Sequence, residues 1–321
     1  MKNKNRITVI DVVRGFALFG VILVNAPTLN SPMEMDTVNF AFQKTLWDKI
    51  ITQFIFGFAM EKFYPIFAFL FGLGTMIFME NAKKKGHRPG LLLSRRLFIL
   101  LVFGCLHAFL VWWGDILIVY AVLGFFLIPF YYLKPRTILV TVIIIFLILI
   151  SINTGLETET ETEEVIDMSM IYQTGSFEEI TKQRIIDYRE CFLYGFEHPE
   201  DRYYLIIYSS YYVHIFAIFL LGAWTQKKRI FQNFIKKQAF LIKIIICTMI
   251  MAFVSNALTY KFSVYARPLF AIKGLCTGLF YMGILVFLYQ MNIGRKLLNP
   301  LAGVGRMSLT NYLCYSLILT T

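Results

Sequence analysis

The feature that most constrains this chain is a series of apolar runs, each about as long as a helix needs to be to cross a bilayer, roughly 20 residues. Residues 95–124, RRLFILLVFGCLHAFLVWWGDILIVYAVLG, contain one of them. Composition agrees, because 58% of the 321 residues are hydrophobic and only 16% are charged, against about 25% charged in a soluble domain. We therefore predict an all-α, polytopic integral membrane helical bundle in the cell membrane. Nine membrane segments are expected, at about 7–28, 50–79, 94–113, 116–133, 136–153, 203–225, 238–258, 268–290 and 303–321.

The basic residues predict the orientation of these segments. They crowd four of the short connections, those after the second, fourth, sixth and eighth segments, and such loops usually lie on the cytoplasmic side. The residues are Lys83, Lys84, Lys85, Arg88, Arg95, Arg96, Lys134, Arg136, Lys227, Lys228, Arg229, Lys236, Lys237, Arg295 and Lys296. This arrangement places the N-terminus in the cytoplasm. The first run contains Asp11 and Arg14, so it does not resemble a cleaved signal peptide.

An acidic segment divides the chain. The net charge is +11, yet residues 156–201 hold 13 of the 20 acidic residues and only three basic ones. We expect a five-helix membrane half (1–153), an acidic extracytoplasmic loop (154–202) and a four-helix membrane half (203–321). Within the loop, LETETETEE is typical of a solvated run. The spacing of apolar residues over 176–196 fits an amphipathic helix on the outer surface, but we favour a simple spacer.

Polar residues inside the first two segments are candidate site residues, because such groups are costly at membrane depth. Asp11 and Arg14 are three apart and can pair on one helix face. Asn25 falls on the same face, about 16 Å further along the axis. The second segment contains Glu61 and Lys62, each of which has either a catalytic or a purely structural role. Pro65 is the predicted break in this long segment and Gly72 and Gly74 the predicted points of close helix approach.

The third segment carries the strongest candidate, His107. A histidine at this depth either moves protons or hydrogen-bonds a neighbouring helix to hold the bundle together. Arg96, eleven residues earlier, is on the same face and nearer the cytoplasm. Asp115 is expected at the outer interface, where it orients His107 only if the helix bends at Gly114.

The remaining polar residues are less informative. We expect structural roles for His214 and Lys273, and Arg306 either receives a phosphate or carboxylate or holds a helix end. The scattered cysteines form no CxxC motif or Cys/His cluster, so no disulfide framework or metal site is indicated. No basic face with interleaved aromatic residues indicates nucleic-acid binding.

Three stretches together resemble the YeiB-like family of uncharacterised bacterial membrane proteins, a domain-of-unknown-function family. They are IDVVRGFALFGVILVN, EKFYPIFAFLFGLGTMIF with the 95–124 run, and VGRMSLTNYLCYSL. The matching positions are Asp11, Arg14, Gly15, Asn25, Glu61, Lys62, Phe63, Gly72, Gly74, Arg95, Arg96, Gly104, His107, Gly114, Asp115, Tyr120, Gly124, Gly305, Arg306, Thr310, Asn311 and Tyr312. The family usually continues with another helix and a Trp- and Pro-containing tail, so we expect this chain, ending at Thr321, to be the shorter.

That family is distantly similar to transmembrane acyltransferases, which include lysosomal heparan-glucosaminide acetyltransferase and the bacterial surface O-acyltransferases. In the O-acyltransferases the first helix pairs a basic residue with a histidine eleven positions later. Arg14 matches the former, but Asn25 stands in place of the histidine. The resemblance therefore implies acyl transfer, by analogy of fold, with His107 rather than the first helix supplying the base.

The sequence leads to three hypotheses about function. In the first, an acyltransferase binds a cytoplasmic acyl-CoA-type co-substrate through Arg14, Arg95, Arg96 and Arg306 and passes the acyl group to a cell-surface acceptor. His107 is then the general base, Asp115 or Glu61 fixes its tautomer and Asn25 donates to the oxyanion. The second is a transporter or flippase of an anionic metabolite or lipid that uses the intramembrane charges as a path. The third is a noncatalytic scaffold. The donor, the acceptor and the oligomeric state stay open, and no tightly bound cofactor is indicated.

Overall fold

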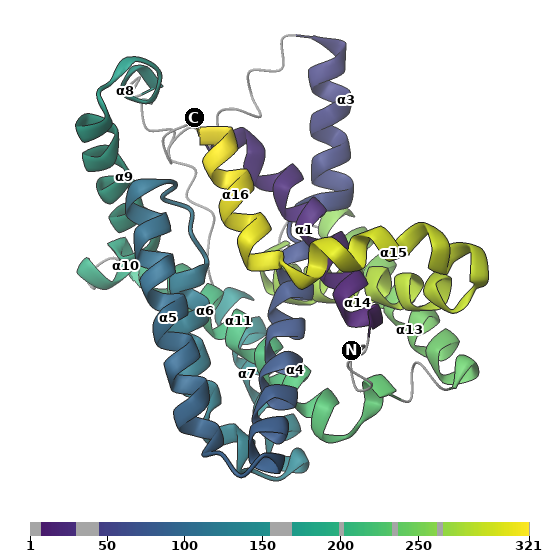
Figure 1. The fold of residues 1–321 in the computed structure, drawn as a ribbon. Helices are drawn as coiled ribbons and strands as arrows, with labels where there is room; N and C mark the ends of the chain where they lie inside the picture. Colours follow the sequence, from purple (N-terminus) through teal and green to yellow (C-terminus); the bar gives the residue numbers. More distant parts are fainter. Residues whose placement is uncertain are drawn as a thin grey trace.

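The helices of this chain cross one another in a bundle with no strand among the residues that the structure describes (Figure 1). The computed structural model describes residues 8–29, 45–154, 169–198, 202–232, 237–261 and 266–320. Seven helices in these ranges are long and apolar enough to cross a membrane. The helical class and the polytopic architecture predicted from the sequence are confirmed, and the chain is a multi-pass integral membrane protein.

The first half begins with α1 (Thr8–Asn25) and the short 3-10 turn η1 (Ala26–Thr28). The second span comprises α3 (Leu46–Phe54), a π-helical turn η2 (Ile55–Ala59) and α4 (Phe63–Lys84). Then follow α5 (Pro89–Leu110), α6 (Leu117–Leu127), the 3-10 turn η3 (Pro129–Tyr131) and α7 (Pro135–Thr154).

The part of the predicted extracytoplasmic loop that the structure describes, residues 169–198, is called the outer segment below. It contains α8 (Ser169–Thr174), α9 (Phe177–Phe192) and α10 (Tyr194–Glu197). The second half contains α11 (Arg202–Lys227), α13 (Gln238–Lys261) and α14 (Ala266–Gln290). It ends with α15 (Asn292–Arg306) and α16 (Ser308–Thr320).

Helix α4 lies at the centre because it is apolar on nearly every face, as expected of a fully surrounded helix. Its Leu70, Leu73 and Met76 are almost completely buried, and it packs on α11, α1, α5 and α14. A Cβ atom at Gly72 would lie 1.9 Å from the carbonyl oxygen of Phe219, so the predicted close approach at Gly72 is confirmed. The peripheral helices α7 and α13 bury only 17% and 22% of their apolar windows, which leaves most of their side chains to lipid.

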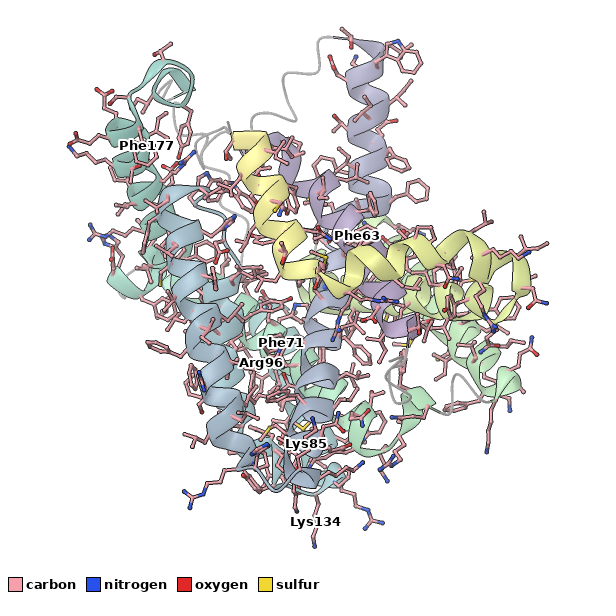
Figure 2. The ribbon with its side chains drawn as sticks, in the orientation of Figure 1. Phe63, Phe71, Lys85, Arg96, Lys134 and Phe177 are labelled. Carbon is pink, nitrogen blue, oxygen red and sulfur yellow. The ribbon has the colours of Figure 1, made fainter. Side chains whose placement is uncertain are left out.

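The two ends of the bundle differ in charge. Lys85 and Lys134 lie at one end and Phe177 of α9 at the other (Figure 2). Short basic connections favour the cytoplasm, and the assignment of the lysine-bearing end to the cytoplasm stays a prediction.

Three expectations about the segments need correction. The predicted ninth segment is two helices, with α15 ending at Arg306 and α16 beginning at Ser308 in a different direction (Figure 1). The predicted fourth segment, 116–133, contains the 11-residue helix α6 followed by the 3-10 turn η3, so it is not one helix of membrane-spanning length. The second span breaks at residues 55–62 rather than at Pro65, which lies in the first turn of α4, where a proline costs no hydrogen bond.

The outer segment is more than a spacer, which corrects the interpretation that we favoured. Helix α9 forms over most of the predicted stretch and packs on α5, with Tyr188 and Phe192 buried. Arg184 donates to the carbonyl oxygen of Leu110 at the end of α5. The acidic run LETETETEE lies outside the described residues.

Candidate functional site

The best-formed polar site lies where α5 ends. Helix α5 stops at Leu110, and the N–H groups of Val111 and Trp112 both donate to the carbonyl oxygen of His107 at 2.9 Å. The chain then turns through two buried tryptophans and Gly114 before α6 begins at Leu117. This turn brings Asp115 back against His107, so the bend that this contact required is present.

The two side chains form a buried hydrogen-bonded pair. His107 Nδ1 lies 2.9 Å from Asp115 Oδ1, and the residues are 2% and 0% exposed. The second carboxylate oxygen accepts from the Ile118 N–H at 3.1 Å. Because a carboxylate accepts at both oxygens, Nδ1 must carry the proton, which leaves the lone pair of a neutral imidazole on Nε2. Among the described residues Nε2 has no hydrogen-bond partner.

Helix α16 and the end of α1 complete the site. The Tyr312 hydroxyl donates to Asp115 Oδ1 at 3.5 Å, and its ring lies 5.0 Å from the His107 ring. One turn later, the Tyr315 hydroxyl accepts from Asn25 Nδ2 at 3.4 Å, and the two tyrosine rings meet edge to face. Asn25 and Asp115 are therefore each hydrogen-bonded to a tyrosine of α16, and the two tyrosines contact each other through their rings.

The two tyrosines are site residues that sequence reasoning did not select. Tyr312 appeared only among the positions of the family resemblance, and Tyr315 did not appear at all. Their three-residue spacing places both on one face of α16, and a helix face of two tyrosines in an apolar segment was the available indication.

Comparisons with known proteins identify the relatives of this chain. It is 33% identical to the uncharacterised protein YxaH of Bacillus subtilis, over 98% of this chain and 81% of that one. The chain belongs to the YeiB-like DUF418 family. The description of the family is "Protein of unknown function (DUF418)", and residues 225–321 match it.

Other members of the family are also uncharacterised. An uncharacterised 39.9 kDa protein of Bacillus acidopullulyticus is 28% identical, over 96% of this chain and 77% of its own. YeiB of Escherichia coli is 29% identical over 122 residues, 36% of this chain and 28% of its own. No solved structure matches. The family thus carries no assigned activity, and the site must be interpreted from its own geometry.

The four arginines that were predicted to bind an anion lie in two separate places in the structure. Arg14 and Arg306 both approach Asp11, at 3.6 and 4.0 Å, where α15 packs against α1. The predicted pair between Asp11 and Arg14 is thereby confirmed. Arg95 and Arg96 are exposed on α5, which packs instead on α6, α4 and α9, and the Arg96 guanidinium lies 4.4 Å from the Phe78 ring centre.

Glu61 does not contact the histidine. Its carboxylate forms an ion pair with Lys273 at 3.0 Å, so the suggestion that it fixes the His107 tautomer is not supported and the orienting carboxylate is Asp115. Lys62 Nζ donates to the carbonyl oxygens of Phe56 and Met60. His214 is buried and lies 3.2 Å from the Tyr64 hydroxyl, as its predicted structural role requires.

The outer segment carries two shifted pKa values. Burial and the neighbouring Asp187, whose Oδ2 accepts from the Tyr172 hydroxyl at 2.6 Å, raise the pKa of Tyr172. Hydrogen bonds from the backbone and side chain of Ser176 lower the pKa of Glu179 and close a capping box at the start of α9. The Tyr172–Asp187 hydrogen bond joins α8 to α9, and the capping box stabilises the start of α9, which packs on α5.

Proposed function

We propose that this protein is an acyltransferase of the bacterial cell membrane. It takes an acyl group from a cytoplasmic acyl-CoA-type thioester and passes it to a hydroxyl or amine of an acceptor nearer the outer face. The observation that carries the proposal is the buried His107–Asp115 pair, whose remaining ring nitrogen has no partner among the described residues. A low-dielectric site with one oriented imidazole suits general-base work.

The chemical step follows from this tautomer. His107 Nε2 accepts the proton of the acceptor as its oxygen or nitrogen forms a bond to the acyl carbon. The carbon–sulfur bond breaks, and the thiolate leaves with the proton that the imidazolium returns. Asp115 stabilises the imidazolium. The Asn25 amide, which donates to Tyr315 in this state, is the proposed donor for the developing oxyanion.

The arginines at the inner end suit the donor. Coenzyme A carries phosphates, and a planar guanidinium binds phosphate through two N–H groups. Arg14 and Arg306 flank Asp11, and the rise of α1 places Arg14 about 16 Å below the level of Asn25. The outward-facing acceptor and the inward-facing donor would thus meet across the helix α1.

The observed state is closed. His107 is 2% exposed, and the rings of Tyr312 and Trp112 lie against it. Turnover therefore requires a movement, and α16 is the suitable element because it packs only lightly on α1 and α15 and exposes Leu317, Ile318 and Leu319.

The same closure favours a second candidate, a noncatalytic scaffold in which His107 only locks three helices together. Transport of an anionic substrate is a weaker candidate, because Arg14, Glu61, Lys273 and His107 each pair locally. A scaffold produces no thiol from an acyl-CoA, and a transporter moves substrate into proteoliposomes without a covalent product.

The deciding experiment measures thiol release from acetyl-CoA by the purified protein in lipid nanodiscs with a set of hydroxyl and amine acceptors. We expect His107→Gln to reduce turnover about 10²–10⁴-fold, the usual contribution of a general base. The control is His214→Gln, which alters a second buried histidine outside the proposed site. Equal turnover of the two variants, with folding verified by thermal melting, would refute the proposed base.

A further inference from the structure

The second span is broken at residues 55–62, between α3 and α4. We call this break the elbow; its backbone is strained, and the proposed reaction does not use it. Between α3 and α4 the chain passes through the π-helical turn η2, and Met60 is extended at ψ 132°. Glu61 then adopts φ +65°, a left-handed conformation that is unfavourable for a residue with a Cβ atom. Strained residues and π-helical turns concentrate at functional sites, because the surrounding structure must hold them in place.

Helix α14 and a lysine hold the elbow. Lys62 Nζ donates to the Phe56 and Met60 carbonyl oxygens at 2.9 and 2.8 Å, and so ties the end of the π-helical turn to the start of α4. Helix α14 approaches so closely that a Cβ atom at Gly274 would lie 2.4 Å from the Glu61 carbonyl oxygen. The geometry is therefore fixed from two sides.

The elbow carries an excess of positive charge. Glu61 Oε2 pairs with Lys273 Nζ at 3.0 Å; the two side chains are 27% and 22% exposed, and Oε2 itself is buried. Lys62, next to Glu61 in the chain, is only 4% exposed, and no described carboxylate is within ion-pair distance of its ammonium group. The hydrogen bonds of Lys62 go to neutral carbonyl groups, and the nearby Glu61 carboxylate is shared with Lys273, so two cations face one carboxylate. A buried cation without a full counter-charge is costly, and an added anion would compensate it.

The depth of the elbow indicates where such an anion comes from. Helix α4 runs 22 residues from Phe63 to Lys84, which is about 33 Å and matches a hydrocarbon core of about 30 Å. With Lys83 and Lys84 at the cytoplasmic surface, the elbow lies at the outer boundary of the hydrocarbon. Cations are uncommon on that side, and lipid phosphates lie at that depth.

Helix α3 supports the same location. It stands away from the other helices beyond the elbow (Figure 1), and none of its residues is buried. Trp47 and Phe54 are 71% and 51% exposed on a helix whose other face carries Asp48 and Gln53. A tryptophan-bearing segment just beyond the end of a membrane-spanning helix is typical of the headgroup region.

We propose that the elbow formed by Glu61, Lys62 and Lys273 binds the phosphate of an anionic phospholipid of the outer leaflet. Lys273 makes the direct contact, and Lys62 supplies a nearby buried charge. Glu61 competes with the phosphate for Lys273. This site is separate from the His107 reaction and does not depend on it.

Native mass spectrometry of the full-length protein tests the proposal, with phosphatidylglycerol and phosphatidylcholine as probes. We expect the wild type to retain phosphatidylglycerol in preference to phosphatidylcholine. Lys273→Met should weaken retention of phosphatidylglycerol about fivefold, the usual effect of one lysine near anionic lipid. Glu61→Gln should strengthen retention, because it removes the competing carboxylate. Lys243→Met is the matched control, because it removes an exposed lysine near the start of α13, away from the elbow. It should leave the retention of phosphatidylglycerol unchanged.

The two variants should change lipid retention in opposite directions, which distinguishes binding from a loss of folding. If the Glu61–Lys273 ion pair were purely structural, both variants would be less stable and neither would bind phosphatidylglycerol more tightly. Lys273→Arg should keep the retention if Lys273→Met folds poorly. Equal retention by wild type and Lys273→Met, or equal retention of the two lipids, would overturn the proposal. Complete displacement of phosphatidylglycerol by inorganic phosphate would also overturn it, in favour of a soluble anion.

Discussion

At the scale of single residues, the chemistry of this protein lies in the few charges that the apolar helices bury. Asp115 is the most constrained of them, because His107 Nδ1, the Ile118 N–H and the Tyr312 hydroxyl all meet its two oxygens. A buried carboxylate with three donors orients each of them, so its removal should affect stability as well as activity.

We expect Asp115→Asn to destabilise the protein by about 1–3 kcal/mol, because a charged acceptor of buried donors is lost. Tyr312→Phe should cost less, about 0.5–1.5 kcal/mol, since its hydrogen bond is long at 3.5 Å. Thermal unfolding in detergent measures both. A larger loss for Tyr312→Phe than for Asp115→Asn would contradict the arrangement of donors described above.

Glu61 offers a test of backbone strain. Glu61→Gly and Glu61→Ala remove the same carboxylate, but only glycine adopts φ +65° without a Cβ penalty. We expect the glycine variant to be the more stable by about 1–2 kcal/mol, the reverse of the usual order in helices. If the alanine variant melts at the same temperature or higher, the elbow is not strained as described.

At the scale of elements, glycines determine how closely helices cross. Helices α1 and α15 pack backbone to backbone: a Cβ atom at Gly305 would lie 1.8 Å from the Asp11 carbonyl oxygen, whereas Gly303 has nothing within 4 Å. The same crossing brings Arg306 to Asp11. The approach of Arg306 to Asp11 therefore depends on this close crossing, to which Gly15 also contributes, because a Cβ atom there would lie 2.1 Å from the Leu301 carbonyl oxygen.

Gly305→Ala should destabilise the protein by about 1–3 kcal/mol, because overpacking forces the two helices apart. Gly303→Ala on the same helix is its control and should stabilise by about 0.5–1 kcal/mol through helix propensity. Chemical unfolding of the two variants in detergent checks the difference. Equal effects would mean that α1 and α15 are not in the close contact described.

Helix α9 should respond to pH through its capping box. The pKa of Glu179 is lowered in the folded protein, so the cap stabilises α9 above the ordinary glutamate pKa of about 4.3 and is lost as the pH falls through the folded value. Ser176→Ala should raise amide hydrogen exchange over residues 177–181 about fivefold at neutral pH, with Ser176→Thr as control. Unchanged exchange in Ser176→Ala would exclude the cap.

At the scale of the whole molecule, the ends of the bundle are distinguished by charge, which predicts their sides of the membrane. In a background without the five native cysteines, Phe177→Cys should react with a membrane-impermeant maleimide in intact cells. Lys134→Cys, at the opposite end (Figure 2), should react only after lysis. The reverse pattern would invert the orientation and with it the assignment of donor and acceptor sides.

Much of the architecture could be predicted from the sequence because hydrocarbon imposes it: backbone groups must be satisfied within each segment, so long apolar runs become helices. The runs at residues 136–153 and 238–258 appear as α7 and α13, close to their predicted ends. The break in the second span was predicted at the wrong place. The π-helical turn packs against α14, and the sequence has no local signal for it that is as clear as a proline.

By itself the sequence determined that this protein is an all-helical membrane bundle of the YeiB-like family, with a buried histidine and a charged first helix. Only the tertiary structure decided the partners: Asp115 for His107, Lys273 for Glu61, and Tyr315 for Asn25. The physical reason is that hydropathy and helical period are local properties of a chain. The partner of a buried polar group depends instead on which helices cross and at what height, and contacts distant in the sequence determine that.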